Sequence, residues 1–148
     1  MAGAPGPALG IDLGDVRIGV AVSDPDRRVA VAVGTVHVGR PPGELRAIAE
    51  LVAEHGATLV VLGLPVSMDG SEGARAALAR AFADALRAAL PVPVVLHDER
   101  LSTVEADRAL AAAGVRGRER RAVIDAAAAQ VILAGWLDAQ RADPPPGD

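Results

Sequence analysis

The sequence predicts an α/β fold in which helices flank a mixed five-stranded sheet. Three observations support it: strand-like runs open the chain, helical periodicity then alternates with short apolar runs, and no linker splits the 148 residues. Strands joined by short turns are expected to pair antiparallel, whereas strands separated by helices are expected to be parallel, with right-handed crossovers. This order is that of the RNase H-like fold; a plain α/β sandwich with another strand order is the alternative.

The first three predicted strands lie in the N-terminal quarter of the chain. Residues 8–14 (ALGIDLG) and 17–24 (RIGVAVSD) alternate in character around a turn signal at Gly14 and Asp15, which predicts a β-hairpin. Residues 28–38 (RVAVAVGTVHV) are rich in β-branched residues with a period of two, which predicts a third antiparallel strand.

The pattern then changes to helices and buried strands. Apolar residues at helical spacing predict helices over residues 44–55 and 74–90, the second of them closed by Pro91. The apolar runs 57–65 (ATLVVLGLP) and 92–99 (VPVVLHDE) predict two buried strands that alternate with these helices.

The C-terminal third is predicted to be helical. Ser102, followed three residues later by Glu105, is a capping-box signature that opens one helix. After a loop over residues 114–121 (GVRGRERR), residues 122–137 are apolar on most sides, which predicts a final, largely buried helix.

The chain ends and the composition limit the class of protein. Residues 1–7 and 141–148 are rich in Pro and Gly and are predicted to be disordered, which leaves one domain over residues 8–140. No cysteine is present, so disulfides, thiolate metal sites and a cysteine nucleophile are excluded. There is neither a signal-peptide pattern nor an apolar run of the roughly 18 residues that span a membrane, so we expect a cytoplasmic protein without membrane partners. The net charge of −4 argues against a general nucleic-acid coating protein, but not against a nuclease.

Asp12 stands alone in a trough of small residues on the first hairpin. Gly10 and Gly14 share its face, and Gly19 lies on the partner strand. Glycines weaken strands, so a ligand or another backbone is expected to come close here. A tight turn is the competing explanation, but it accounts for Gly14 and not for Gly10 or Gly19.

Glu99 and Asp125 are the other candidate carboxylates. Glu99 ends the predicted strand 92–99, and ligands of open α/β sheets bind outside the carboxyl ends of strands. Asp125 lies on the mostly apolar final helix, where a lone buried carboxylate would be costly. The competing explanations are solvated charges at a strand end and a helix-dipole contact in the first turn of the helix. The sequence leaves open whether His97 or Asp98 takes part.

These three carboxylates predict a metal site if the fold brings them together. Their repulsion would require either a cation or raised pKa values. Oxygen ligands select Mg²⁺ or Mn²⁺, and two such ions about 4 Å apart can activate a water and stabilise the leaving oxygen of a phosphodiester.

Basic and glycine-rich segments are candidate phosphate contacts. Residues 63–73 (GLPVSMDGSEG) open a helix and could hold a phosphate through backbone amides, although a simple capped connection fits equally well. A basic patch precedes the final helix and could bind a nucleic-acid backbone, a solvated charge run being the alternative. Its members are Arg116, Arg118, Arg120 and Arg121.

Four segments, in this order, resemble the YqgF family, also called RuvX. They are IDLGDVRIGVAVSD, GLPVSMDGSEG, DERLST and VIDAAAA. The resemblance implies an RNase H-like fold and a role in maturing the 5′ end of 16S ribosomal RNA, and the family is also described as Holliday junction resolvase-like. Asp12, Glu99 and Asp125 match the family's three acidic positions. The family commonly has Lys-Arg before IGVA, whereas this chain has Val16 and Arg17, so one candidate phosphate contact is missing.

Together these features predict a metal-dependent endonuclease. Asp12, Glu99 and Asp125 would hold the metals, while Arg17, Arg100 and the basic patch would position phosphates. Precursor ribosomal RNA is favoured over branched DNA, because symmetric cutting of a junction demands a two-fold dimer and the sequence shows no dimer surface; the protein is expected to be a monomer or a homodimer. The alternatives are a catalytically silent nucleic-acid-binding module and a sugar-kinase or actin-like ATPase, which would need a second domain.

Overall fold

The computed structural model describes residues 3–39, 43–101 and 117–142. Within them, one mixed sheet has the strand order β3-β2-β1-β4-β5, which confirms the predicted sheet and places β1 at its centre. The strands are β1 (Ala8–Leu13), β2 (Arg17–Ser23), β3 (Ala30–His37), β4 (Leu59–Leu64) and β5 (Val94–Asp98).

The pairing follows the predicted order. Strand β2 is antiparallel to both β1 and β3, while β4 is parallel to both β1 and β5. Strands β1, β4 and β5 therefore end at one edge of the sheet, which we call the carboxyl edge. The first hairpin and the later parallel strands are both confirmed.

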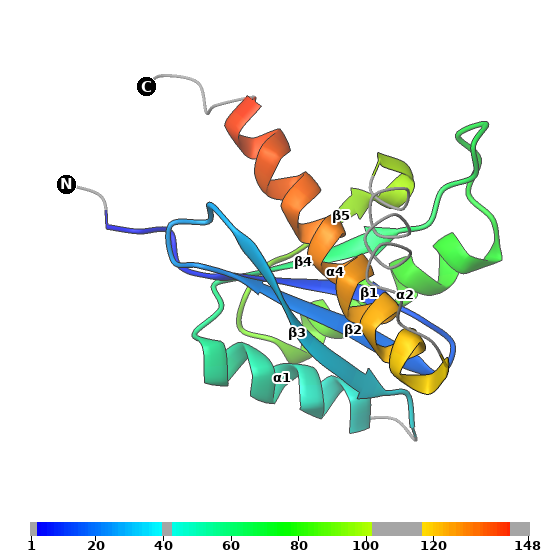
Figure 1. The fold of residues 1–148 in the computed structure, drawn as a ribbon, viewed down its shortest axis with the longest axis horizontal. Helices are drawn as coiled ribbons and strands as arrows, with labels where there is room; N and C mark the ends of the chain where they lie inside the picture. Colours follow the sequence, from blue (N-terminus) through cyan, green and yellow to red (C-terminus); the bar gives the residue numbers. More distant parts are fainter. Residues whose placement is uncertain (1–2, 40–42, 102–116, 143–148) are drawn as a thin grey trace.

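Helices cover the two faces of the sheet (Figure 1). On one face lie α1 (Gly43–His55) and α2 (Ala74–Ala89), whose buried residues pack with alternate residues of the strands such as Leu9 and Ile11. On the other face α4 (Gly117–Ala142) crosses β1, β2 and β3. Burial of these two aliphatic cores, at about 25 cal/mol per Å² of apolar surface, is the main stabilising term.

Small residues let α4 approach the sheet closely. A Cβ atom on Gly10 would lie 2.7 Å from Cβ of Leu133, and one on Gly19 would overlap the carbonyl oxygen of Asp125. The neighbour predicted from these glycines is therefore the backbone and side chains of α4. Both glycines are structural requirements of this contact.

The C-terminal helix begins earlier than predicted. Helix α4 begins at Gly117, so the prediction of a loop is wrong for residues 117–121. Arg and Glu are good helix formers, and nothing in RERR interrupts a helix. The helix ends at Ala142, two residues past the predicted domain limit at 140. The capping box at Ser102 lies outside the described residues; before it, η1 (Glu99–Leu101) is a single 3₁₀ turn.

The end of the predicted disordered N-terminal segment is bonded to the domain. The amide of Thr58 donates to the carbonyl of Pro7 at 2.8 Å, and the amide of Gly6 donates to that of Pro25 at 3.0 Å. Gly6 and Pro7 are therefore held against the domain by backbone hydrogen bonds. No helix in the described ranges is long and apolar enough to cross a membrane.

Candidate active site

The three predicted carboxylates come from three elements that meet at the carboxyl edge. Asp12 is near the end of β1, Glu99 follows β5, and Asp125 lies on α4, whose backbone touches β2 beside Asp12. Strand β4 separates β1 from β5, but its residue here is Gly63. A Cβ atom on Gly63 would lie 2.8 Å from Oε2 of Glu99 and 2.6 Å from Cδ1 of Ile132. The missing side chain thus leaves room for Glu99 over β4.

The electrostatics of Asp12 show that the three groups act on one another. Burial, followed by the negative charges of Glu99 and Asp125, raises the pKa of Asp12 to about 7, against a smaller opposing effect of Arg75. Burial also raises the pKa of Glu99, with Asp98 adding to it and Arg75 opposing. Asp12 is therefore repelled by the other two carboxylates, and such repulsion favours binding of a cation.

Asp125 is held by Arg17. Nε of Arg17 donates to Oδ2 of Asp125 at 2.8 Å, and the two side chains are only 22% and 24% exposed. Arg17 was predicted to contact phosphates, but here its guanidinium bonds a carboxylate of the cluster. This pair joins the hairpin to α4 and supplies the cluster with one compensating charge.

The donor set fits a hard divalent cation in chemistry, but not yet in geometry. Carboxylate oxygens are the ligands that Mg²⁺ and Mn²⁺ prefer. Among the described residues, however, no three His, Asp or Glu side chains are grouped closely enough to hold one ion. The structure brings Asp12, Glu99 and Asp125 to one place without forming a single coordination sphere.

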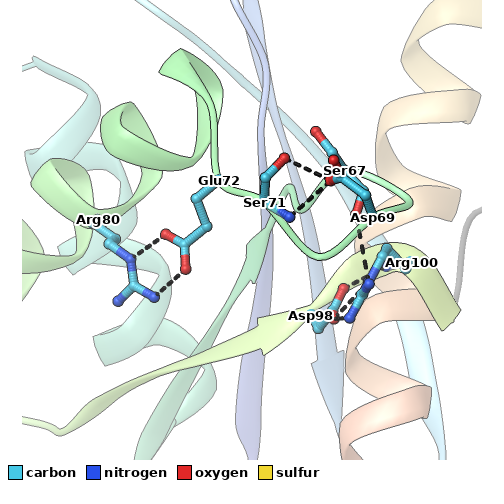
Figure 2. A network of polar contacts seen from close by, with 7 residues as sticks. All are labelled: Ser67, Asp69, Ser71, Glu72, Arg80, Asp98 and Arg100. Atoms are coloured by element: carbon cyan, nitrogen blue, oxygen red, sulfur yellow. Dashed lines mark hydrogen bonds and ion pairs between the residues drawn. The ribbon is translucent and has the colours of Figure 1, made fainter.

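Arg100, also predicted to contact phosphates, has internal partners (Figure 2). Its guanidinium pairs with Asp98 at 2.6 Å, and its backbone amide donates to the same carboxylate at 2.9 Å. Its Nη1 also reaches the carbonyl of Ser67 at 3.5 Å. Arg100 therefore ties the loop over residues 65–73 to the end of β5, beside Glu99.

Several backbone amides of the loop over residues 65–73 donate hydrogen bonds to acceptors within the same loop. The amide of Ser67 donates to Ser71, that of Gly70 to Ser67, and that of Ser71 to the Asp69 carboxylate. At the far end of the loop, Arg80 pairs with Glu72 through two bonds of 2.6 and 2.8 Å, also drawn in Figure 2. These internal bonds favour a simple connection over the predicted phosphate loop, although the N-cap residue of α2, Gly73, makes no side-chain cap bond.

Two functional candidates were missed by the sequence reasoning. Gly63 is the first residue of the segment GLPVSMDGSEG. Its role depends on the side chain of Glu99 lying over β4, and the sequence pattern does not predict that contact. Arg75, in the first turn of α2, lowers the pKa values of both Asp12 and Glu99. The position of Arg75 could have indicated its role, because it is a basic residue in the first turn of a helix that begins at the carboxyl edge.

The remaining predicted residues are not part of the described cluster. Arg116 lies outside the described residues, and the other arginines of the basic patch lie in the first turns of α4, with side chains outside the description. His97 is half-buried, and burial lowers its pKa against the opposing charge of Asp98. Its Nε2 has no hydrogen-bond partner among the described residues.

Solved structures of other proteins have a similar fold. RuvC of T. thermophilus, solved with a Holliday junction substrate, has a TM-score of 0.55 at 18% identity, covering 93% of this chain and 96% of RuvC. The fowlpox virus resolvase, solved with junction DNA, has a TM-score of 0.56 at 9% identity, covering 90% of this chain and 97% of the resolvase. The fold is therefore that of the RNase H-like resolvases.

Sequence comparison then gives the family. The family described as "RuvX: Holliday junction resolvase" matches residues 6–139, so the chain belongs to the RuvX family. A relative from Anaeromyxobacter sp. (strain K) is 55% identical, over 88% of this chain and 95% of its own. One from Myxococcus xanthus (strain DK1622) is 53% identical, over 95% and 91%. Both carry the name "Putative pre-16S rRNA nuclease".

Proposed function

We propose that this protein is a metal-dependent endonuclease that hydrolyses phosphodiester bonds in precursor 16S ribosomal RNA. The observation that carries the proposal is the meeting of Asp12, Glu99 and Asp125 at the carboxyl edge, where burial and the negative charges of the other two raise the pKa of Asp12. Membership of the RuvX family and the names of the relatives support a nuclease. Burying three carboxylates together lowers stability, and a catalytically silent module would gain nothing from it. We expect the protein to act in the cytoplasm.

Asp12, Glu99 and Asp125 would hold Mg²⁺ or Mn²⁺ ions. A pair of such ions, when bound, would activate a water and neutralise the developing charge on the phosphate oxygens. The chain's own residues prepare the site: Arg17 orients Asp125, and Gly63 leaves space for Glu99. Arg75 adds a guanidinium suited to a substrate phosphate.

The test is cleavage of a precursor RNA that spans the 5′ end of 16S ribosomal RNA. We expect cutting in Mg²⁺ or Mn²⁺ and none in chelator. Glu99→Gln and Asp125→Asn should each lower the rate by about a thousandfold, and the double variant should be little worse, because ligands of one site act as a unit. Full activity in either purified variant would contradict the assignment.

Resolution of four-way DNA junctions is the second candidate. The description of the family and the two resolvases of similar fold favour it. Resolution requires two symmetric cuts and hence a dimer with two sites facing one junction, whereas RNA processing needs one site per cut. A synthetic junction and the precursor RNA should be compared under one metal condition. Symmetric nicking of the junction, with the RNA left whole, would reverse our choice.

A further inference from the structure

A cavity of about 440 Å³ opens at the end of β1, on the face of the sheet that α1 and α2 cover, and apart from Arg75 its lining has been given no role so far. It lies between the β1–β2 turn, α1 and α2, and its walls are mostly apolar; among them are Ile18, Leu45, Leu78 and Phe82. Its size and lining are typical of sites for small organic groups. Residues 13–15, which directly follow Asp12, also line it, so the cavity and the cluster share one strand end.

Three charged residues line the cavity, and two of them, Glu44 and Arg75, could contact a ligand; the third is Asp15. Oε2 of Glu44 is buried without a hydrogen-bond partner among the described residues. A carboxylate only accepts hydrogen bonds, so a group with N–H or O–H donors would satisfy this oxygen. Arg75 also lines the cavity, and its positive charge acts on Asp12 and Glu99. Glu44 and Arg75 each lie in the first turn of a helix, where the helix dipole adds positive potential.

We infer that this cavity receives one unstacked base of the nucleic-acid strand being cut, with guanine preferred. The apolar walls would cover the faces of the base, Glu44 would accept from its donor edge, and Arg75 would hold a phosphate next to the carboxylates. Guanine fits best because N1–H and the N2 amino group lie side by side and can both meet one carboxylate, whereas uracil offers a single N–H. The inference rests on the proposed function, since it takes the substrate to be nucleic acid.

Binding of mononucleotides tests the cavity without any cleavage. Guanosine 5′-monophosphate, added to the metal-free protein, should shift the amide NMR signals of residues 13–15 and 78–82. Uridine 5′-monophosphate should bind at least fivefold more weakly, and ribose 5-phosphate should leave the signals of the apolar wall unmoved. Equal shifts by all three compounds, or none by any, would overturn the inference.

A matched pair of variants on α2 separates filling of the cavity from general effects. Ala81 and Ala88 are both exposed, but only Ala81 lines the cavity. Ala81→Leu should weaken binding of guanosine 5′-monophosphate at least tenfold, while Ala88→Leu should leave it unchanged. If both variants bind like the wild type, no base enters this cavity.

Cleavage assays distinguish failure of this inference from failure of the proposed function. Precursor RNAs should be compared that carry guanine or uracil at each unpaired position flanking the cut. Glu44→Gln should reduce the preference for guanine, mainly through KM, whereas Glu50→Gln, on the same helix but away from this cavity, should retain it. Normal cleavage with no base preference would contradict this inference but not the proposed function. Nucleotide binding at the cavity without any cleavage would contradict the proposed function but not this inference.

Discussion

Asp12 illustrates the conflict between stability and function at the scale of one residue. Its folded-state pKa is about 7, against an ordinary value of 3.8, because it is buried beside two other carboxylates. The native state therefore keeps a proton that the unfolded chain loses from about pH 4 upward. Stability falls as pH rises between these two values and stays reduced above about pH 7.

Replacement of Asp12 by Asn should therefore stabilise the metal-free protein at high pH. At pH 8, Asp12→Asn should raise the free energy of unfolding by up to about 4 kcal/mol, and it should weaken the pH dependence between pH 4 and 7, leaving the part that comes from Glu99. Urea unfolding at pH 5 and pH 8 measures both effects. Asp84→Asn, at an exposed site on α2, is the control. Equal stability of Asp12→Asn and wild type at pH 8 would contradict the buried charge.

Arg100 should act on the loop over residues 65–73 more than on the substrate. Arg100→Lys keeps the charge but not the two-point pair with Asp98, so the amides of Ser67 and Gly70 should exchange with solvent several-fold faster, as in Arg100→Ala. Hydrogen exchange measures this, with Arg46→Ala as the control. If amide exchange is unchanged in both variants, and RNA binding is weaker in Arg100→Ala but not in Arg100→Lys, Arg100 contacts a phosphate instead.

At the scale of elements, the packing of α4 on the hairpin depends on Gly19. An Ala side chain there would collide with the backbone of Asp125, which cannot move without shifting the whole helix. Gly19→Ala should cost about 3 kcal/mol or more of stability. Gly73→Ala, with open space around its Cβ and a φ of −98°, should stay within about 0.5 kcal/mol of wild type. Thermal unfolding of both decides, and a stable Gly19→Ala protein would contradict the close packing.

The elements that sequence predicted well are those with local signals. The alternation of residue types around Asp12 predicted both the hairpin and the first candidate carboxylate. The end of the apolar run at Glu99 predicted the second candidate carboxylate. The pairing of Arg17 with Asp125 was out of reach, because the partners lie 108 positions apart and nothing local links them. The beginning of α4 was misjudged because an arginine-rich run suits a loop and a helix equally well. Arg100 was assigned to phosphate although its partner, Asp98, is two residues away.

At the scale of the whole molecule, binding of the proposed RNA substrate would have to overcome an overall negative charge of −4. We expect the arginines at the beginning of α4 to supply the local attraction, with little sequence preference and with affinity falling steeply as salt rises. Replacing Arg118, Arg120 and Arg121 by Ala should flatten the slope of log affinity against log salt by about 0.7 for each phosphate that is no longer neutralised. Arg28→Ala with Arg46→Ala provides the control. An unchanged slope would show that the patch is only solvated.

Helix α4 is the last element of the chain to be synthesised, and it covers one whole face of the sheet. As the chain emerges during synthesis, the hairpin, the parallel strands and the core beneath α1 and α2 can form first, since domains fold from their N-terminal side. The opposite face, including Ala8, Ala21 and Val61, stays bare until Ala129 and Leu133 arrive to cover it. Asp125 arrives with them. A growing chain therefore lacks the complete cluster of three carboxylates until its C-terminal helix has been made and has packed on the sheet.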